Sequence, residues 1–462
     1  MKNAELDTFL EEATGLPGAI ETDEQSETQA PADAIRSTAG EVYYDVGKKS
    51  YWIANSRNGW IEVTETALRR HLKGFGYSVK VPEGALLSPL DERLIQIQTH
   101  FDVAFAGSLA GHFKGVMECF GTRILVTDSP RLIDPIHANW PTIGGLLSNL
   151  FDNGDFDQRP YVFGWLKVAV QALREGICRP GQILAMAGPR ECGKSLLQNH
   201  IITPLLGGRT AKPFRYMSGN TDFNGELFGA EHLTIEDESS STDIRSRRHL
   251  GARIKDFTVN ETQSHHAKNR QAITLRPFWR VSISLNDEPE NLLILPPLDE
   301  SLADKIILLK AQKRPMPMPT QTLAERERFK ATIAGELPAF VHFLLHQYEI
   351  PEELKSDRFG VTHYHHPELV AALDDLSPHL RLLALIDGVL FNTSAAGAWE
   401  GTADRLEREL RDSPSGHEVS RLLTFNTACG VYLSRLRQRL PERVDQSRAS
   451  QGRRWIIKPP EF

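Results

Sequence analysis

The chain has 462 residues, more than one hydrophobic core normally supports, so we expect two or three folded units. With 40% hydrophobic residues, 24% charged residues and a net charge of -7, its composition is that of an ordinary globular protein. No run of about 18 apolar residues occurs and the first residues are acidic, which argues against a membrane-spanning helix and a secretory signal. The four cysteines form no C-x-x-C pair, so we expect no disulfide framework or cysteine-rich zinc module, and we expect a cytoplasmic protein.

Charge is unevenly distributed along the chain. Residues 1–41 carry ten acidic residues against two basic ones, whereas residues 421–458 carry nine basic residues against two acidic ones. Because residues 1–40 also largely lack hydrophobic periodicity, we predict that they form a disordered acidic leader. The basic stretch suits a polyanionic partner, although a solvated surface would account for it as well.

From Glu41 the sequence alternates aromatic and polar residues across glycine-containing turns. This alternation over 42–63 predicts an antiparallel hairpin sheet. Thr64 suits the N-cap of a following helix, and a further strand is expected at 122–128. We therefore predict an accessory domain of α+β type over 41–155.

The most informative motif begins at Gly188. Residues 188–195 read GPRECGKS, a complete G-x-x-x-x-G-K-S, between an apolar strand at Ile183–Ala187 and a predicted helix over 196–206. Such a loop wraps backbone N–H groups around a phosphate at a helix N-terminus, and glycine allows the close approach. We predict that Lys194 neutralises the phosphates of ATP and that the Ser195 hydroxyl holds Mg²⁺. The predicted nucleotide-binding residues are Gly188, Pro189, Arg190, Glu191, Cys192, Gly193, Lys194 and Ser195.

Three acidic residues end the next apolar strand. The stretch His232–Glu236 is followed directly by Asp237 and Glu238. At a strand end beside the loop, one carboxylate can hold the metal and the next can polarise the attacking water. We assign Glu236 to the metal and Asp237 to the water, with Glu238 as the alternative if the register differs by one residue.

A third apolar strand, over 278–286, ends in Asn286. An amide at this position can hold the attacking water or contact the γ-phosphate without adding negative charge. A turn-forming asparagine before Asp287 and Pro289 is the structural alternative. The motifs from Lys194 to Asn286 span 93 residues.

This compact order of motifs resembles superfamily 3 helicases, and more narrowly the helicase portion of phage- and plasmid-type primase-helicases. The resemblance covers about residues 180–350 and is strongest at 188–195 and Asn286. It implies an AAA+-like α/β ATPase core over 156–350, which works as a homo-hexameric ring and pulls single-stranded DNA through its centre. No primase site is evident in the first 180 residues, so priming would need a separate primase.

The resemblance also implies a hairpin whose basic tip projects into the channel and grips DNA. The sequence suggests two polar strands, at 258–261 and 271–275, separated by a basic segment. A lysine at such a tip contacts any phosphate as a point charge, so the grip does not depend on base sequence. The matching residues are His265, His266, Lys268 and Arg270, with Lys255 at the start of the motif.

The sequence departs from the family at the cation that reaches the nucleotide of a neighbouring subunit. The family carries an arginine pair after the third strand, whereas this chain has Lys305 nearest that position. Lysine supplies charge without a bidentate fork. The alternatives are Arg314 and the upstream residues Arg245, Arg247 and Arg248.

For residues 351–462 we predict a winged helix. Three helical stretches, at 380–391, 399–413 and 424–443, precede a two-stranded hairpin. Cations on the third helix and the hairpin would neutralise the phosphates of duplex DNA, which makes binding steeply salt-dependent. A winged helix used only for protein contacts is the alternative. The predicted DNA-binding residues of this unit are Arg435, Arg437, Arg439, Arg453 and Arg454.

We therefore expect an ATP-dependent DNA helicase or translocase that serves replication of a phage, plasmid or integrated mobile element. Two other interpretations remain: a nucleotide-switched winged-helix regulator that binds an operator, and an ATPase of a mobile-element defence system without processive unwinding. The expected catalytic residues are Lys194, Glu236, Asp237, Asn286 and Lys305.

Overall fold

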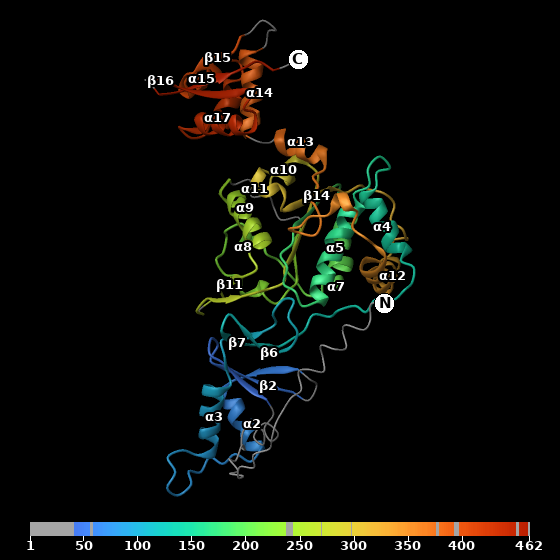
Figure 1. Ribbon diagram of the computed structural model, residues 1–462, viewed down its shortest axis with the longest axis vertical. Helices are drawn as coiled ribbons and strands as arrows, with labels where there is room; N and C mark the ends of the chain where they lie inside the picture. Colours follow the sequence, from blue (N-terminus) through green and yellow to red (C-terminus); the bar gives the residue numbers. More distant parts are fainter. Residues whose placement is uncertain are drawn as a thin grey trace, which may run out of the picture.

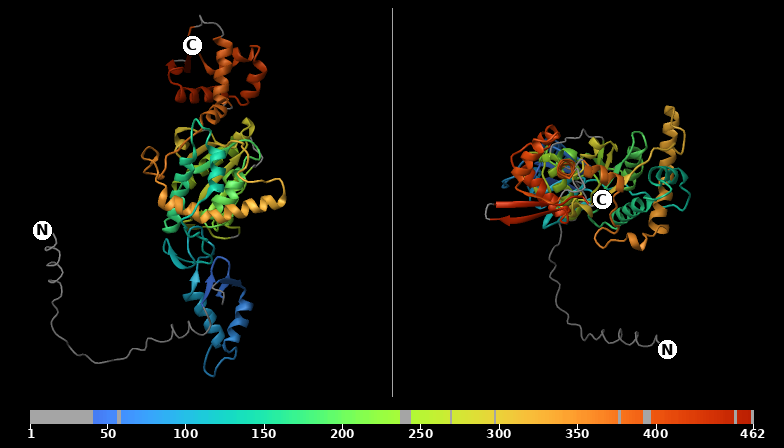
Figure 2. Two further views of the ribbon diagram at one scale, coloured as in Figure 1. Left: turned by 90° about the vertical axis from the view of Figure 1, so that its right-hand side faces the viewer. Right: turned by 90° about the horizontal axis from the view of Figure 1, so that it is seen from above.

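The computed structural model describes residues 41–55, 59–236, 244–268, 270–296, 298–375, 378–391, 397–449 and 452–460. Three regions follow one another along the long axis, with the N-terminal sheet at one end and the C-terminal helices at the other (Figures 1 and 2). Within these ranges, no helix is both long and apolar enough to cross a membrane. The acidic leader over 1–40 lies outside the described residues.

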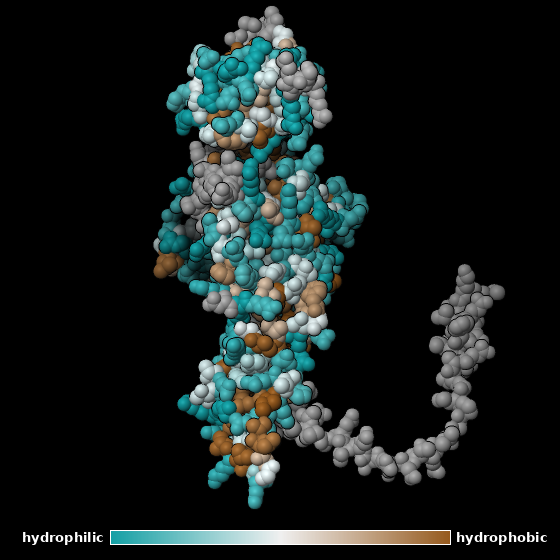
Figure 3. Space-filling model, turned by 90° about the vertical axis from the view of Figure 1, so that its left-hand side faces the viewer, coloured by the Kyte–Doolittle hydropathy of each residue, from teal (hydrophilic) through white to brown (hydrophobic). Residues whose placement is uncertain are grey.

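The N-terminal region contains a four-stranded sheet in the order β3-β2-β1-β4. Its strands are β1 (Val42–Asp45), β2 (Ser50–Ala54), β3 (Trp60–Val63) and β4 (Asp102–Val103). The predicted hairpin and the helix α2 (Glu65–Gly74) are confirmed, and the Thr64 side chain accepts a hydrogen bond from the Ala67 N–H as an N-cap. The helix α3 (Pro89–His100), which Ser88 caps, is not among the predicted elements. Apolar side chains gather on the surface at this end of the molecule (Figure 3). Leu86 is among the exposed apolar residues of the N-terminal region.

A small three-stranded sheet connects this region to the centre. It has the order β5-β7-β6, and its strands are β5 (Phe105–Gly107), β6 (Gly115–Cys119) and β7 (Thr122–Val126). Phe105, Ile124 and Val126 belong to the same hydrophobic cluster as the central sheet. The helices α4 (Pro141–Phe151) and α5 (Arg159–Arg174) likewise share one cluster. The boundary expected at residue 155 therefore falls between two helices of a single packed core.

The central sheet has five parallel strands in the order β14-β8-β13-β10-β9. They are β8 (Ile183–Ala187), β9 (Thr210–Ala211), β10 (His232–Glu236), β13 (Arg280–Leu285) and β14 (Ile306–Lys310). Both faces are covered, as a parallel sheet of nearly continuous apolar strands requires. Alternate residues of β8 point to opposite clusters: Ile183 and Ala185 face one, and Leu184 and Met186 face the other.

The other helices and strands of the central region surround this sheet. They are α6 (Lys194–Leu197), the π-helical turn η1 (Gln198–Ile202), α7 (Thr203–Leu205), α8 (Phe214–Met217), η2 (Gly225–Leu227), α9 (Ile244–Val259), β11 (Gln263–His265), β12 (Ile273–Leu275), α10 (Pro289–Leu292), α11 (Glu300–Ala303), α12 (Leu323–His342), η3 (Phe343–Gln347), η4 (Glu352–Leu354) and α13 (Pro367–Asp375). The strand expected at 258–261 is wrong, because Thr258 lies in α9 and its hydroxyl donates to the Ile254 carbonyl.

The C-terminal region has a hydrophobic cluster of its own, formed by residues between Leu382 and Ile457. Its elements are α14 (Pro378–Leu390), β15 (Trp399–Gly401), α15 (Ala403–Arg411), α16 (Gly416–Leu422), α17 (Ala428–Arg439), β16 (Val444–Ala449) and β17 (Gly452–Ile457). The helix predicted over 399–413 is wrong at Trp399, and α16 is not among the predicted elements. Trp399 instead begins a third strand, which pairs with β17 beside the predicted hairpin.

Candidate functional site at the carboxyl edge of the central sheet

The glycine-rich loop (188–195) follows β8 at the carboxyl edge of the sheet. Gly188 passes so close to the Ala311 carbonyl oxygen that a Cβ there would clash with it. Gly193 has a φ of 109°, which favours glycine, and it forms the N-cap of α6. Both glycines of the motif are therefore required by the backbone, and the loop ends at a helix N-terminus as predicted.

Lys194 lies at the centre of this loop. Its side chain is only 6% exposed, and its Nζ donates hydrogen bonds to the carbonyl oxygens of Gly188 at 2.7 Å and Pro189 at 2.8 Å. The neighbouring Ser195 is exposed at the start of α6. A positive charge is thus held inside the loop, with the exposed Ser195 beside it.

Asn286 and Glu236 lie along the same edge of the sheet as the loop. Leu285 is the register partner of Ala187, and its carbonyl accepts a hydrogen bond from the Gly188 N–H at 3.2 Å. Asn286 follows directly and is 9% exposed. Glu236 pairs with Ser284 on the other side of β13. Since strands are about 4.8 Å apart, Glu236 is on the order of 10 Å from the loop strand, which leaves room for a phosphate and a metal ion.

Asn199 is a site residue that the sequence analysis missed. Its Nδ2 donates to Glu236 Oε1 at 2.8 Å, so it orients the carboxylate assigned to the metal. Asn199 is four residues after Ser195 along one continuous helix, and this spacing could have revealed it. Asp237 and Glu238 lie outside the described residues.

A buried polar network joins the helix after the loop to two of the strands. Gln198 Nε2 donates to Ser282 Oγ at 2.7 Å, and the two ring nitrogens of His232 lie 2.7 Å from the hydroxyls of Ser282 and Thr203. Complete burial lowers the pKa of His232 to about 3, so its ring is neutral near pH 7. The network fixes β10 and β13 relative to the helix that begins at Lys194.

The segment after β14 also passes the loop. Lys313 Nζ lies 3.6 Å from Glu191 Oε2, and Arg314 beside it is exposed. Lys313 was not foreseen, because a lone lysine in an irregular segment gives no sequence signal. Both cations are therefore near the carboxyl edge of their own sheet.

Lys305 does not support the role expected for it. Its carbonyl accepts from the Ile183 N–H, which places it at the amino edge, opposite the loop. Its side chain is 8% exposed, and its Nζ pairs with Asp304 at 2.6 Å. A buried, neutralised lysine cannot extend to a neighbouring subunit without losing this pair.

Two of the upstream alternatives have described side chains. The half-buried Arg247 donates to the Leu295 carbonyl at 3.0 Å, and burial lowers the pKa of its guanidinium. Arg248 is exposed on α9. Arg248 is therefore the more accessible of these two, and the side chain of Arg245 lies outside the described residues.

The hairpin between β10 and β13 is present, but its tip is shorter than expected. β11 and β12 pair antiparallel, with His265 opposite Ile273. His265 is 5% exposed and packs against the rings of Phe105 and Phe228, and burial lowers the pKa of its imidazole to about 4. The prediction that His265 contacts DNA is therefore not supported, because its ring belongs to the core.

The remaining tip residues are more accessible. Lys268 is exposed, Arg270 is half-buried, and the His266 ring packs against Phe223. Asn224 fixes the base of the hairpin by donating to the Ser264 carbonyl and accepting from the His266 N–H. Lys268 is thus the most exposed cation among the predicted tip residues.

In the C-terminal region, the predicted arginines do not form one row. Arg435 is half-buried and shares a face of α17 with Arg439, four residues later. Arg437 points elsewhere and lies 3.4 Å from Asp445 of β16. On β17, Arg453 is exposed and Arg454 pairs with Glu400 at 3.5 Å. These pairs are exposed, so they can exchange for phosphate at little cost.

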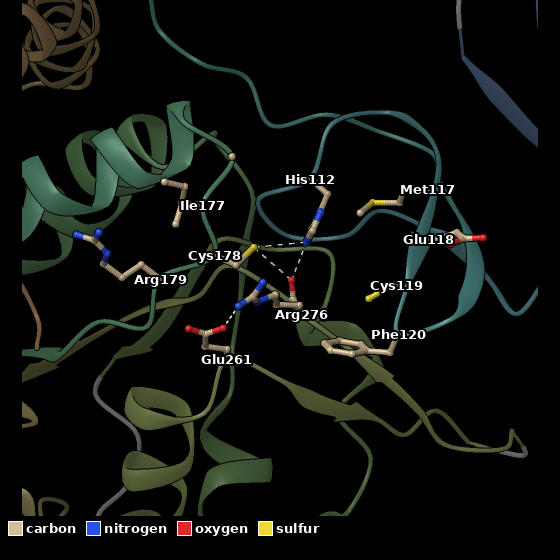
Figure 4. Close-up of a pocket in the computed structure, with 11 residues that line it drawn as sticks. His112, Met117, Glu118, Cys119, Phe120, Ile177, Cys178, Arg179, Glu261 and Arg276 are labelled. Atoms are coloured by element: carbon tan, nitrogen blue, oxygen red, sulfur yellow. Dashed lines mark hydrogen bonds and ion pairs between the residues drawn. The ribbon is translucent and has the colours of Figure 1, made fainter.

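A cavity of about 680 Å³ lies away from the loop, near the amino edge of the sheet (Figure 4). Cys178 and Arg179, which precede β8, line it together with Arg276, which precedes β13. The β6–β7 turn forms another wall. All four cysteines of the chain are free and buried.

Comparisons with known proteins support the fold. A family model described as a family of unknown function (DUF5906) matches residues 186–300. No curated protein matches the chain. Two structures of the NrS-1 C-terminal region each cover 93% of this chain and 98% of that chain with a TM-score of 0.54, at 12% and 13% identity. The SCCmec type IV Cch active helicase is 10% identical and covers 87% of this chain and 73% of that chain with a TM-score of 0.32. The chain thus shares a mixed α/β fold with the NrS-1 C-terminal region.

Proposed function

We propose that the protein is an ATP-dependent DNA helicase or translocase of superfamily 3 type that acts in replication of a mobile element. The observation that carries this proposal is the convergence of three motifs at one sheet edge. The glycine-rich loop follows β8, Asn286 follows the adjacent β13, and Glu236 ends β10 one strand further. Separation of the loop strand from the acidic strand by one intervening strand is the arrangement expected of an AAA+-like core.

The residues at this edge fit a nucleoside triphosphate with Mg²⁺. Lys194 already uses its ammonium to hold two carbonyls, and it can release them to bind phosphate oxygens. The exposed Ser195 hydroxyl and the Glu236 carboxylate, oriented by Asn199, would hold the metal. The bound metal would neutralise charge that develops on the phosphates. Asp237 would orient the attacking water, and the Asn286 amide would contact the γ-phosphate.

DNA would engage two separate surfaces of the molecule. Lys268, with His266 and Arg270, would contact the backbone of a single strand in the channel of a hexameric ring. The winged-helix-like C-terminal region would bind duplex DNA through exposed arginines on α17 and β17. Arg248 or Arg314, rather than Lys305, would supply the cation to the neighbouring subunit. A separate primase would provide primers.

The test is ATP hydrolysis with and without single-stranded DNA, together with displacement of an annealed strand. Lys194→Ala removes the charge within the loop, and we expect hydrolysis to fall by roughly 100-fold or more. Lys330→Ala is the matched control, because Lys330 is a lysine on α12 whose side chain is 40% exposed and pairs with Glu327. Hydrolysis that survives Lys194→Ala unchanged would remove the assigned nucleotide site.

The second candidate function is a nucleotide-switched DNA-binding regulator. The separate hydrophobic cluster of the C-terminal region favours it, since a unit with its own core can bind an operator independently. Sequence-specific duplex binding that changes with nucleotide, without hydrolysis stimulated by single-stranded DNA, would support this candidate. Stimulated hydrolysis coupled to strand displacement would support the helicase.

A further inference from the structure

Phe120 occupies the turn between β6 and β7 in an unfavourable conformation. Its φ is 52° and that of Gly121 is 72°, a pair that suits asparagine or glycine at the first position rather than a bulky residue. Its side chain is also 59% exposed. A positive φ is unfavourable for a bulky residue, and more than half of the surface of Phe120 stays in water instead of in the core.

The Phe120 ring borders the cavity near the amino edge of the central sheet. Figure 4 shows the ring pointing toward Arg276, whereas Glu118 extends away from the other lining side chains. Met117 and Cys119 face inward, because alternate residues of a strand point to opposite sides. The volume of about 680 Å³ can accommodate a nucleoside-sized ligand.

A second hollow of about 270 Å³ also has Phe120 in its lining. Ile273 and Leu275 of β12 form one wall, and Thr122 and Ile124 of β7 form the other. Phe120 thus lines both hollows, the larger one beside Arg276 and the smaller one along β12. We call the two hollows together the Phe120 groove.

The chemistry of the groove suits a nucleobase better than a free anion. Arg276 pairs with Glu261, and His112 Nε2 lies 2.6 Å from the Arg276 carbonyl. Burial lowers the pKa of His112 and raises that of Cys178 to about 11, so both are neutral near pH 7. The wall therefore combines neutral hydrogen-bonding side chains and one ion pair, whose charges cancel, with the face of an aromatic ring. A base has polar edges and a π-face that match these groups.

We propose that the Phe120 groove binds single-stranded DNA by stacking one base on the Phe120 ring, with that base in the larger cavity. The proposal rests on the proposed DNA-translocating function and adds a second contact to the hairpin. The Arg276 guanidinium is 44% exposed at its pair with Glu261, so it can exchange the carboxylate for the phosphate next to the stacked base.

The test measures binding of fluorescent oligo-dT to the full chain without ATP. We expect Phe120→Asn to weaken binding by roughly tenfold, since stacking on an aromatic ring is lost. Its thermal midpoint should equal or exceed that of the wild type, because asparagine tolerates a positive φ. Phe120→Trp should retain binding. The control is Phe113→Ala, which removes a phenylalanine that is 48% exposed and does not line the groove.

Three results would overturn the proposal. Wild-type affinity in Phe120→Asn would exclude stacking, and a joint fall in thermal midpoint and affinity would indicate a structural role. A changed oligomer mass with unchanged affinity would identify the ring as a subunit contact.

An oligonucleotide with abasic sites should bind wild type and Phe120→Asn equally. If wild type binds no DNA, the proposed function fails as well, whereas failure of this inference alone leaves DNA-stimulated hydrolysis intact.

Discussion

His232 is the residue whose burial has the clearest consequence for stability. Its pKa is lowered from 6.5 to about 3 in the folded protein. As the pH falls below 6.5, His232 is therefore protonated in the unfolded chain but stays neutral in the folded chain. The free energy of unfolding should therefore decrease by about 1.4 kcal/mol per pH unit between these values on account of this residue. Above pH 6.5 the effect should vanish. Urea unfolding between pH 7 and pH 5 measures it.

The variant His232→Gln can keep polar contacts with Thr203 and Ser282 but does not titrate. It should unfold with a shallower pH dependence than the wild type. The matched control is His417→Gln, which replaces an exposed histidine and should leave the slope unchanged. Equal slopes in wild type and His232→Gln would contradict the assignment.

At the scale of elements, the start of α12 is set by a capping box. The Thr322 hydroxyl accepts from the Glu325 N–H, and the Glu325 carboxylate accepts from the Thr322 N–H. Thr322→Ala should lower the free energy of unfolding by about 1 kcal/mol. Thr332→Ala makes the same chemical change within the helix, where the hydroxyl only bonds back to the Arg328 carbonyl, and should be nearly neutral. Denaturant midpoints of both variants test this.

A variant in the hairpin of β11 and β12 should affect strand displacement and leave basal ATP hydrolysis nearly unchanged. Lys268 is exposed at the tip, whereas Lys194 bonds to carbonyl oxygens within the glycine-rich loop. We expect Lys268→Ala to reduce strand displacement at least tenfold while basal hydrolysis stays within twofold, because only a phosphate contact is lost. Parallel assays on the same preparation measure both. An equal decline in both activities would argue against a gripping role.

The sequence predicted best those elements that local chemistry determines. The loop, the strands that flank it and the Thr64 cap follow from short sequence motifs, each of which is compatible with one backbone conformation. The first hairpin strand was misplaced because α9 continues through Thr258 to Val259, whereas β12 lies within the second predicted strand. His265 was misassigned because its burial depends on Phe105 and Phe228, which are far away in the sequence. The third strand at Trp399 could not be foreseen, since three residues carry too little periodicity.

At the scale of the whole molecule, the hydrophobic clusters predict where the chain can be divided. The cluster between Leu382 and Ile457 contains residues of the C-terminal region only. A chain that ends at residue 375 should therefore fold and keep basal ATP hydrolysis, but lose most of its affinity for duplex DNA. Circular dichroism, hydrolysis and duplex binding by the truncated chain check this expectation.

A matched truncation at the other end should behave differently. Removing residues 1–130 takes Phe105, Ile124 and Val126 out of the cluster that they share with the central sheet. We expect an aggregating product, because a large apolar surface would become exposed. A soluble and active chain that starts at residue 131 would show that this shared core is dispensable.

The hydrogen bonds through Gln198, Ser282 and His232 have a mechanical consequence. They hold the helix after the glycine-rich loop rigidly against β10, which ends in Glu236, and β13, which ends just before Asn286. Under the proposed function, hydrolysis of the nucleotide at the carboxyl edge would move the helix and the two strands together as one rigid body. The strands would not separate from each other. The amino edge of this rigid body, next to Phe120, would then move by a comparable distance. A small displacement at the nucleotide would thus be transmitted to the bound nucleic acid directly through the sheet.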